Sequence, residues 1–291
     1  MDRNSPESYV EPSAAAAVAS AERFVSAVLR EGALCAGGLV TPVVTPRFVP
    51  TCSAELMAGL GDVAARHGVP VQSHLAESEA EIAWVRELHP QAASYAHVYD
   101  GFGLMPEGNG SYMAHCVHLT RAEAELMRSR GCGVCHCAAS NFALRSGAAD
   151  VRQLRAWGLE VGLGTDVAGG WSPSMLDAVR MTATAANARA FPGEPNEAAG
   201  ALPLEELLFM ATQGGANVLR LGDVVGSFEA GKEFDALLVD VDAPGSPVDA
   251  FPEDDARARL AKWMFNGDDR NIVRVYVRGK LVSGQEALRH P

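Results

Sequence analysis

Two hydrophobic patterns alternate along residues 39–191. Short apolar runs that end in a polar residue are followed by longer stretches with apolar positions every three or four residues. The first pattern predicts strands and the second predicts surface helices, because strands buried on both faces have nearly continuous apolar sequences. Five strands are expected, within residues 39–46, 69–75, 111–116, 133–138 and 159–166.

The helices expected between and around these strands have recognisable ends. Thr120, with Glu123 three residues later, has the pattern of a capping box, and Gly131 is the expected end of that helix. Gly32 and Gly68 are expected to end two earlier helices. Residues 97–110 are expected to form a glycine-rich loop. The expected helices span residues 14–30, 54–67, 78–89, 120–130, 151–157, 172–191 and 203–219.

The alternation of strands and helices predicts an α/β fold with a parallel sheet and right-handed crossovers. A closed β/α barrel has eight such units and about 250 residues. Because only five strands are expected up to Asp166, we expect a (β/α) TIM-like barrel that is N-terminally incomplete. Its missing strands would lie upstream of Met1.

The last part of the chain has a different pattern. Residues 226–240 and 273–282 alternate apolar and polar positions around Gly-Lys turns, which predicts a small accessory β-unit made from the C-terminal tail. The polar N-terminus, residues 1–12, is expected to be disordered. The expected organisation is therefore a partial (β/α) barrel catalytic domain over 13–222, followed by the accessory β-unit and closing segment over 223–291.

Composition narrows the function classes. The 291 residues are 48% hydrophobic and 21% charged, as in ordinary globular proteins, and carry a net charge of −12. That charge argues against binding a nucleic-acid backbone. The apolar runs are shorter than the ~20 residues that span a bilayer, so no membrane association is expected. The N-terminus lacks a secretion-signal pattern, and a cytosolic protein with reduced cysteines is expected.

Three of the expected strands end in chemically capable residues. His74 ends one strand and is followed by Glu77, His115 ends the next, and Asp166 ends the last. The carboxyl ends of parallel strands share one edge of a sheet, where β/α folds build their sites. Two histidines and two carboxylates at that edge suit a metal-assisted hydrolase.

Each of these residues also has a purely structural interpretation. His74 and His115 fit a protein core, Glu77 fits the first turn of a helix, and Asp166 fits a helix N-cap. The cluster at 132–137 contains three cysteines and a histidine, but it sits in one predicted strand rather than in two separated ligand pairs. We interpret these cysteines as packed thiols rather than a structural zinc site.

Six motifs in a fixed order connect the chain to a known family. Together they closely resemble the guanine deaminase family of the amidohydrolase superfamily, over nearly the whole chain from about residue 20 onward. TPRF and TDVAGG are the most specific parts of this resemblance. The motifs are VTPRF at 44–48, SHLAE at 73–77, MAHC at 113–116, HCAASN at 136–141, GLGTDVAGG at 162–170 and GKEFDALLVD at 231–240.

The resemblance implies a metal-dependent-hydrolase barrel that deaminates guanine to xanthine and ammonia by zinc-dependent hydrolysis, as part of guanine catabolism. It implies that His74 and Asp166 are zinc ligands and that Asp166 also takes a proton from the attacking water. Glu77 would protonate the purine ring. His115 would lie beside the metal and stabilise developing charge.

Substrate contacts follow from the same resemblance. Arg47 would bind the oxo edge of guanine and Phe48 would pack on its ring, while His74, Glu77 and Asp166 also face the base. The family implies that the complete protein is a homodimer with a small-molecule substrate.

One departure from the family leaves alternatives open. No His-x-His pair, which supplies two metal ligands in this superfamily, occurs in the chain. His74 and Asp166 remain as ligands, with His115 as a candidate third. The function is therefore either a zinc hydrolase or a non-catalytic short form that associates with partner subunits. A third alternative is a related amidohydrolase that acts on another aminated heterocycle.

Overall fold

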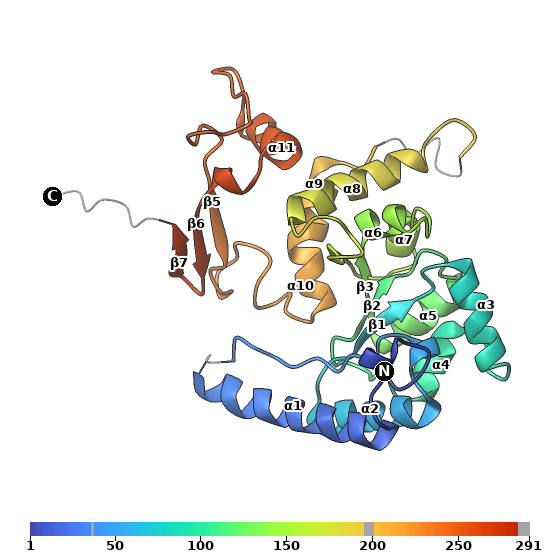
Figure 1. Cartoon of the computed structure of the whole chain (residues 1–291). Helices are drawn as coiled ribbons and strands as arrows, with labels where there is room; N and C mark the ends of the chain where they lie inside the picture. The colour runs from blue at the N-terminus through green and yellow to red at the C-terminus, as the bar shows by residue number, and fades with distance from the viewer. Residues whose placement is uncertain (36–37, 195–200, 285–291) are drawn as a thin grey trace.

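The computed structural model describes residues 1–35, 38–194 and 201–284, which form a parallel α/β unit followed by a small antiparallel sheet (Figure 1). The parallel sheet has the strand order β1-β2-β3-β4, the same as the order along the chain. Its strands are β1 (Gln72–Leu75), β2 (Tyr112–His115), β3 (Gly133–His136) and β4 (Val161–Leu163). Within the described residues this sheet is open, and the expected α/β class with parallel strands is confirmed.

The expected first strand is reduced to a single bridge between Val44 and Val71. Val44 accepts a hydrogen bond from the Gln72 amide at 3.0 Å and donates to the carbonyl of Pro70 at 2.9 Å, so the segment still lies along β1. Pro42 and Pro46 bracket this bridge. Because proline lacks the amide hydrogen that a sheet ladder needs, the pairing does not extend into a strand.

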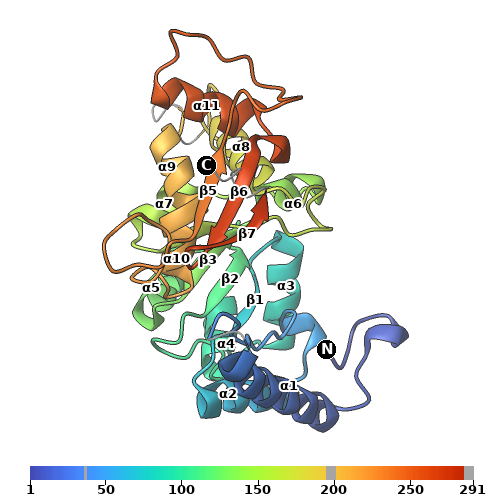
Figure 2. The same cartoon turned by 90° about the vertical axis from the view of Figure 1, so that its left-hand side faces the viewer.

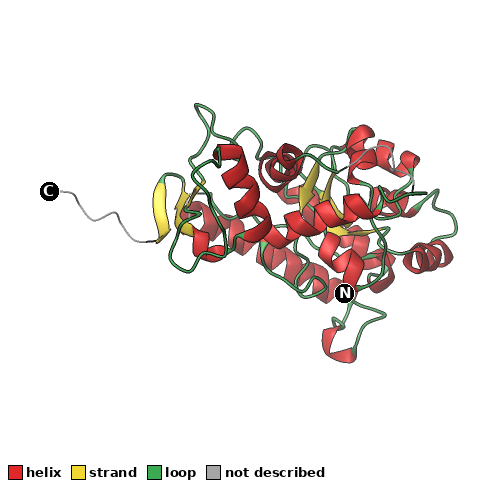
Figure 3. Ribbon diagram, turned by 90° about the horizontal axis from the view of Figure 1, so that it is seen from above, coloured by secondary structure: helices red, strands yellow, loops and turns green. Residues whose placement is uncertain are grey.

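Helices follow the strands in the alternation that the sequence predicts, and two further helices, over 95–101 and 138–143, were not predicted. In Figure 3 the strands of the parallel sheet lie between helices, and the antiparallel strands lie on the side nearer the C-terminus. Along β1 and β2 buried and half-buried residues alternate, so the two faces of these strands are covered to different extents. These helices are α1 (Ala14–Cys35), α2 (Ala54–His67), α3 (Glu79–Leu88), α4 (Tyr95–Gly101), α5 (Arg121–Arg130), α6 (Ala138–Ala143), α7 (Val151–Ala156) and α8 (Met175–Ala188).

Local capping sets most of the helix ends. Thr120 and Glu123 form the expected capping box at the start of α5, and Ser78 forms a second one with Glu81 at the start of α3. Helices α2 and α5 end at Gly68 and Gly131, and both glycines adopt the left-handed conformation. These predicted boundaries are confirmed to within one residue.

Two expectations about loops are wrong. Helix α1 continues past Gly32, where a β-carbon would meet the carbonyl oxygen of Val40 at 2.9 Å. That glycine therefore permits a close approach of the returning chain rather than ending the helix. The expected loop at 97–110 begins with α4, whose Tyr95 and Tyr99 are buried, so packing of aromatic side chains outweighs the weak helical signal.

The expected helix at 203–219 forms as three connected pieces: α9 (Leu204–Phe209), a π-helical segment η4 (Met210–Gly214) and α10 (Gly215–Val218). It packs closely on the parallel sheet. A β-carbon on Gly162 in β4 would lie 2.8 Å from the Cα of Gly215, so this contact requires glycine on the strand.

The C-terminal β-unit is an antiparallel sheet of order β5-β6-β7. It contains β5 (Ala236–Val239), β6 (Ile272–Val277) and β7 (Lys280–Gly284), as the alternating pattern predicts. Helix α11 (Ala256–Asn266), which the sequence analysis did not anticipate, comes between β5 and β6 and contacts α8. In Figure 2 this helix lies at the opposite end of the molecule from α1 and α2. The division of the chain at residue 222 stays a prediction.

Residues 1–12 differ from the expected disorder. The Asp2 carboxylate accepts hydrogen bonds from the amide and hydroxyl of Ser53, and Asn4 donates to the carbonyl of Pro50 at 2.7 Å. A short 3-10 helix, η1 (Glu7–Tyr9), follows. The polar side chains that suggested disorder are thus bound to η2 (Val49–Thr51) and the start of α2. No helix in the described ranges has the length and apolarity needed to cross a bilayer.

The buried His136 predicts a pH-dependent stability. Neither ring nitrogen has a hydrogen-bond partner, and burial, aided by the nearby His115, lowers the pKa of His136 from 6.5 to about 4. The unfolded chain therefore binds the extra proton first, so stability is full above pH 6.5 and falls as the pH drops toward 4. This group alone accounts for at most roughly 3 kcal/mol of that loss.

We expect His136→Leu to remove this component, which urea unfolding between pH 7.5 and pH 4.5 measures. The matched control is His97→Leu, since His97 is exposed. A pH dependence of unfolding in His136→Leu equal to that of the unsubstituted chain would contradict the assignment.

Candidate metal centre

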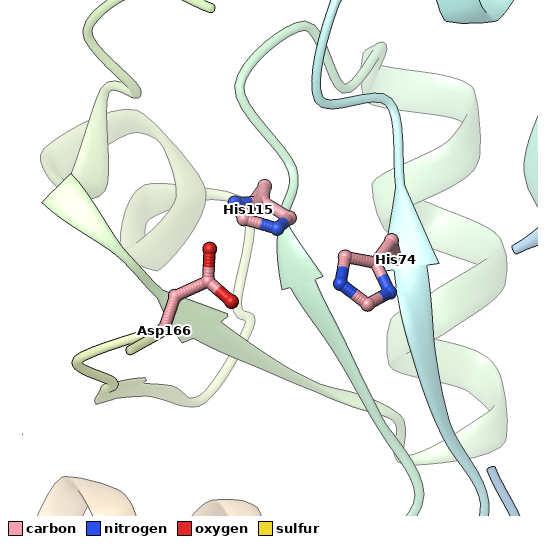
Figure 4. A group of neighbouring side chains, drawn as sticks. All are labelled: His74, His115 and Asp166. Atoms are coloured by element: carbon pink, nitrogen blue, oxygen red, sulfur yellow. The ribbon is translucent and has the colours of Figure 1, made fainter. Parts of the chain in front are cut away.

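The carboxyl ends of the parallel strands bring three potential metal ligands together. His74 lies on β1 and is paired in register with Ala114, while His115 is the last residue of β2. Asp166 follows the end of β4. One ligand atom from each of the three lies within 4.8 Å of the others, and Figure 4 shows the side chains pointing toward one another.

Hydrogen bonds on the far side of each imidazole set its orientation. His74 donates from Nδ1 to the carbonyl oxygen of Arg47 at 2.6 Å. His115 donates from Nδ1 to Oδ1 of Asn141 at 2.9 Å. Because a carbonyl oxygen only accepts, the proton sits on Nδ1 and the lone pair sits on Nε2, which is the arrangement of metal-ligating histidines.

The donor set fits a metal ion. Nε2 of His115 is buried and has no hydrogen-bond partner, which costs free energy unless an ion or another group binds it. Burial lowers the pKa of His74, and the neighbouring His115 lowers it further, so the neutral ligating form is favoured. Two imidazoles and one carboxylate are typical ligands of a catalytic zinc, which leaves a fourth position open.

Backbone conformation at the strand ends is unusual. Ala76, His115 and Asp166 all have positive φ angles, of 50°, 71° and 48°. Non-glycine residues rarely adopt this region, and such strain tends to collect at functional sites. These positive φ angles lie at the carboxyl ends of β1, β2 and β4, where the side chains of the metal-ligand group converge.

Glu77 lies beside this group. Its Oε2 is 3.7 Å from Nε2 of His115, and its Oε1 accepts a hydrogen bond from the hydroxyl of Ser146 at 2.9 Å. The side chain is about one-fifth exposed, so one carboxylate oxygen can reach a bound molecule. This position allows proton transfer next to the metal ligands without ligation.

Arg47 contacts His74 and Phe48 contacts α3, in ways that the sequence did not predict. It is the carbonyl of Arg47 that holds His74, through both the ring and the backbone amide, while the residue as a whole is exposed. The ring of Phe48 packs edge-on against Trp84 of α3, with centroids 6.4 Å apart. Their roles in substrate binding stay a prediction.

Sequence reasoning missed the polar residues that orient the site. Asn141 is the last residue of the HCAASN motif, and its side chain accepts a hydrogen bond from His115, so its place in the motif was the signal that could have identified it. Ser146 lies outside every motif, and its contact with Glu77 spans 69 positions along the chain. Cys132 and Cys137 are buried and Cys135 is half-buried, and the interpretation of these cysteines as packed thiols stays a prediction.

Comparison with family models matches residues 1–282 to the amidohydrolase family. The chain belongs to this family. A probable guanine deaminase from Schizosaccharomyces pombe is 43% identical over 98% of the chain, and guanine deaminase from Mus musculus is 40% identical over 97%. The resemblance indicated by the motifs is thereby confirmed.

Solved amidohydrolase structures have the same fold. The structure of guanine deaminase from C. acetobutylicum with bound guanine matches 97% of the chain at 35% identity and a TM-score of 0.86. An adenosine deaminase from Xanthomonas campestris with bound zinc matches 94% at 25% identity and a TM-score of 0.76. The expected fold class is confirmed, and metal-dependent chemistry is typical of the family.

The matched relatives are longer than this chain. The chain spans 53% of the S. pombe protein, 61% of the mouse protein and 64% of the C. acetobutylicum chain. Their activity is therefore a hypothesis for this chain rather than a consequence of the match.

The geometry predicts metal binding that depends on three named side chains. We expect His74→Ala, His115→Ala and Asp166→Ala each to weaken zinc binding by more than roughly 100-fold. Mutating a residue that only hydrogen-bonds to a metal ligand typically costs roughly 10- to 100-fold, and losing a ligand itself should cost more. Metal titration followed by elemental analysis measures this. His97→Ala, an exposed histidine, is the control, and equal affinity in His97→Ala and His74→Ala would contradict the ligand assignment.

Proposed function

We propose that this chain carries the site of a zinc-dependent guanine deaminase, which hydrolyses guanine to xanthine and ammonia. The main support is the metal-ligand group of His74, His115 and Asp166, with the unpartnered Nε2 of His115 facing it. This group lies in a chain that is 38–43% identical, over at least 97% of its length, to guanine deaminases from Dictyostelium discoideum and Mus musculus and to a probable guanine deaminase from S. pombe.

In this proposal His74 and Asp166 hold the zinc, with His115 as the third ligand. Zinc bound there would supply a nucleophile for hydrolysis at neutral pH. Asp166 accepts a proton from the attacking water, and Glu77 delivers a proton to the purine ring. The Glu77 side chain is about one-fifth exposed, so a bound base can reach its carboxylate.

Guanine as substrate is supported by the residues that precede β1. Arg47 presents a planar set of donors that matches the oxo edge of guanine, and Phe48 offers an aromatic ring for the base to pack on. His74, Glu77 and Asp166 would also face the base. The relatives named guanine deaminases agree with this choice. A homodimer and a cytosolic location are part of the same proposal.

Two alternatives remain, each with its own observation. The lack of a His-x-His pair in this sequence favours the alternative of a non-catalytic form that associates with partner subunits. A 5-methylthioadenosine/S-adenosylhomocysteine deaminase from Moorella thermoacetica is 35% identical over 87% of the chain, which favours another aminated heterocycle as substrate. Assays with guanine, 5-methylthioadenosine and zinc distinguish these outcomes.

The decisive variant is Glu77→Gln. We expect it to lower the rate of xanthine formation by roughly 100- to 10,000-fold, because the amide cannot transfer the proton. Zinc content should not change, since Glu77 is outside the ligand group. The control is Glu79→Gln, an exposed glutamate in the first turn of α3. Zinc binding without any xanthine formation in the unsubstituted chain would favour the non-catalytic alternative.

A second variant tests the substrate assignment. We expect Arg47→Ala to raise the KM for guanine while kcat changes less, because the guanidinium is assigned to binding rather than to proton transfer. The backbone carbonyl that holds His74 is retained in this variant, so zinc content should stay the same. Arg121→Ala, an exposed arginine on α5, is the control; an unchanged KM in Arg47→Ala would remove Arg47 from the substrate site.

A further inference from the structure

We propose that Ser146 is a positioning residue that selects which oxygen of Glu77 faces the reaction, and that the turn at 141–147 sets the spacing between Glu77 and His115. This inference rests on the proposed function, because it assigns a supporting role within the same site. Neither the family resemblance nor the metal-ligand group identifies Ser146.

All three polar groups of Ser146 are engaged. Its hydroxyl donates to Oε1 of Glu77 at 2.9 Å, its amide donates to the carbonyl of Asn141 at 2.8 Å, and its carbonyl accepts from Nε2 of His118 at 2.8 Å. The residue is 8% exposed. The backbone of Ser146 is thus held on both sides, and its buried hydroxyl is hydrogen-bonded to Glu77.

The hydrogen bond distinguishes the two oxygens of Glu77. The Ser146 hydroxyl donates to Oε1, so this oxygen is the one that the hydrogen bond holds. Oε2 is then the oxygen on the side of the site, 3.7 Å from Nε2 of His115. Without the Ser146 hydroxyl, the Glu77 carboxylate could rotate about χ3, because this terminal torsion is broad. That rotation would exchange the two oxygens and turn Oε2 away from His115.

The backbone of the turn is built for this contact. Arg145 has a φ of 59° and Gly147 a φ of 130°, which brings the chain sharply back toward Asn141. A β-carbon on Gly147 would meet Cγ1 of Val117 at 3.0 Å. The positive φ favours glycine at 147 and a β-carbon there would crowd Val117, so Ser146 lies between two residues with positive φ angles.

The same turn also supports the metal-ligand group. The Asn141 carbonyl accepts a hydrogen bond from the amide of Ser146, and the Asn141 side-chain oxygen accepts one from Nδ1 of His115. Asn141 is fully buried, so neither contact is exposed to solvent competition. The segment 141–147 thus contacts His115 through Asn141 and Glu77 through Ser146, and these two hydrogen bonds set the separation between His115 and Glu77.

The test compares Ser146→Ala and Ser146→Thr in the full 291-residue chain loaded with zinc, with Ser129→Ala on the exposed face of α5 as control. We expect Ser146→Ala to lower kcat about ten-fold, the scale expected for losing a hydrogen bond to a charged group. KM, zinc content and melting temperature should stay unchanged. Ser146→Thr, which keeps the hydroxyl, should restore most of kcat.

A merely structural role predicts a different pattern. Melting temperature, zinc content and kcat would fall together, and the hydroxyl of Thr would not rescue the rate selectively. That pattern, or an unchanged kcat in Ser146→Ala, would overturn the inference. Should Ser146→Ala fail to fold, Ser146→Cys takes its place, because its thiol has a similar shape but is a weak donor.

A spectroscopic measurement separates this inference from the proposed function. Carbon-13 labelling of glutamate side chains reports the Glu77 carboxyl signal, assigned with Glu77→Gln. We expect this signal to shift in Ser146→Ala and to keep its position in Ser146→Thr and Ser129→Ala. If the unsubstituted chain forms no xanthine, the proposed function fails, and the carboxyl signal of Glu77 alone then tests the Ser146–Glu77 contact. A shift confined to Ser146→Ala supports this contact, and the lack of a shift overturns it.

Discussion

The parallel pairing of β1 with β2 is the constraint on which the site depends. His74 and His115 belong to neighbouring strands that run in the same direction, so their carboxyl ends reach the same edge of the sheet. An antiparallel pairing would place the two imidazoles at opposite ends of the strands. β3 and β4 continue the sheet in order and deliver Asp166 to the same edge. The ligand group is therefore a product of topology before any side-chain contact forms.

Contacts outside the ligand group then determine what the imidazoles can do. Each histidine has its Nδ1 proton fixed by an oxygen of the protein, from Arg47 for His74 and from Asn141 for His115. Both lone pairs are thereby directed inward. The positive φ angles at His115 and Asp166 oppose this arrangement energetically, and the surrounding hydrogen bonds maintain it. The site is preorganised at the expense of local backbone strain.

The sequence predicted the features that local chemistry determines. The capping box at Thr120 and the glycine ends of α2 and α5 depend on a few adjacent residues, and these are confirmed. The strands were recognisable by their apolar runs, except where Pro42 and Pro46 interrupt the first. Helix α4 was missed because its stability comes from burying Tyr95 and Tyr99 against distant parts of the chain.

In the candidate site, too, the residues set by local sequence were predictable and those set by distant contacts were not. His74, Glu77, His115 and Asp166 could be named from the sequence because each follows an apolar run at a strand end. Ser146 could not, because its partner lies 69 positions away and only the folded chain brings them together. The hydrogen bond between His74 and the backbone carbonyl of Arg47 could not be predicted either, because every residue has a carbonyl and the sequence does not show which one is used. Predictability thus falls as the contacts become less local.

One atom decides how the site is to be understood, and that atom is Nε2 of His115. It has a single lone pair, so it can bind a metal or accept a proton from Glu77, but it cannot do both at once. If it binds zinc with His74 and Asp166, the chain itself supplies the three protein ligands that a catalytic zinc requires. Glu77 is then free to exchange its proton with the substrate.

If other residues of a longer protein held the metal instead, Nε2 of His115 would remain available to Glu77 at 3.7 Å. The pair would then act as a proton relay beside the metal rather than as a ligand and a base. His74, His115 and Asp166 form the one metal-ligand group found among the described residues, so metal chemistry by that part of the chain depends on the first arrangement. The coordination of His115 is therefore the physical difference between a hydrolase and a binding-only form of this chain.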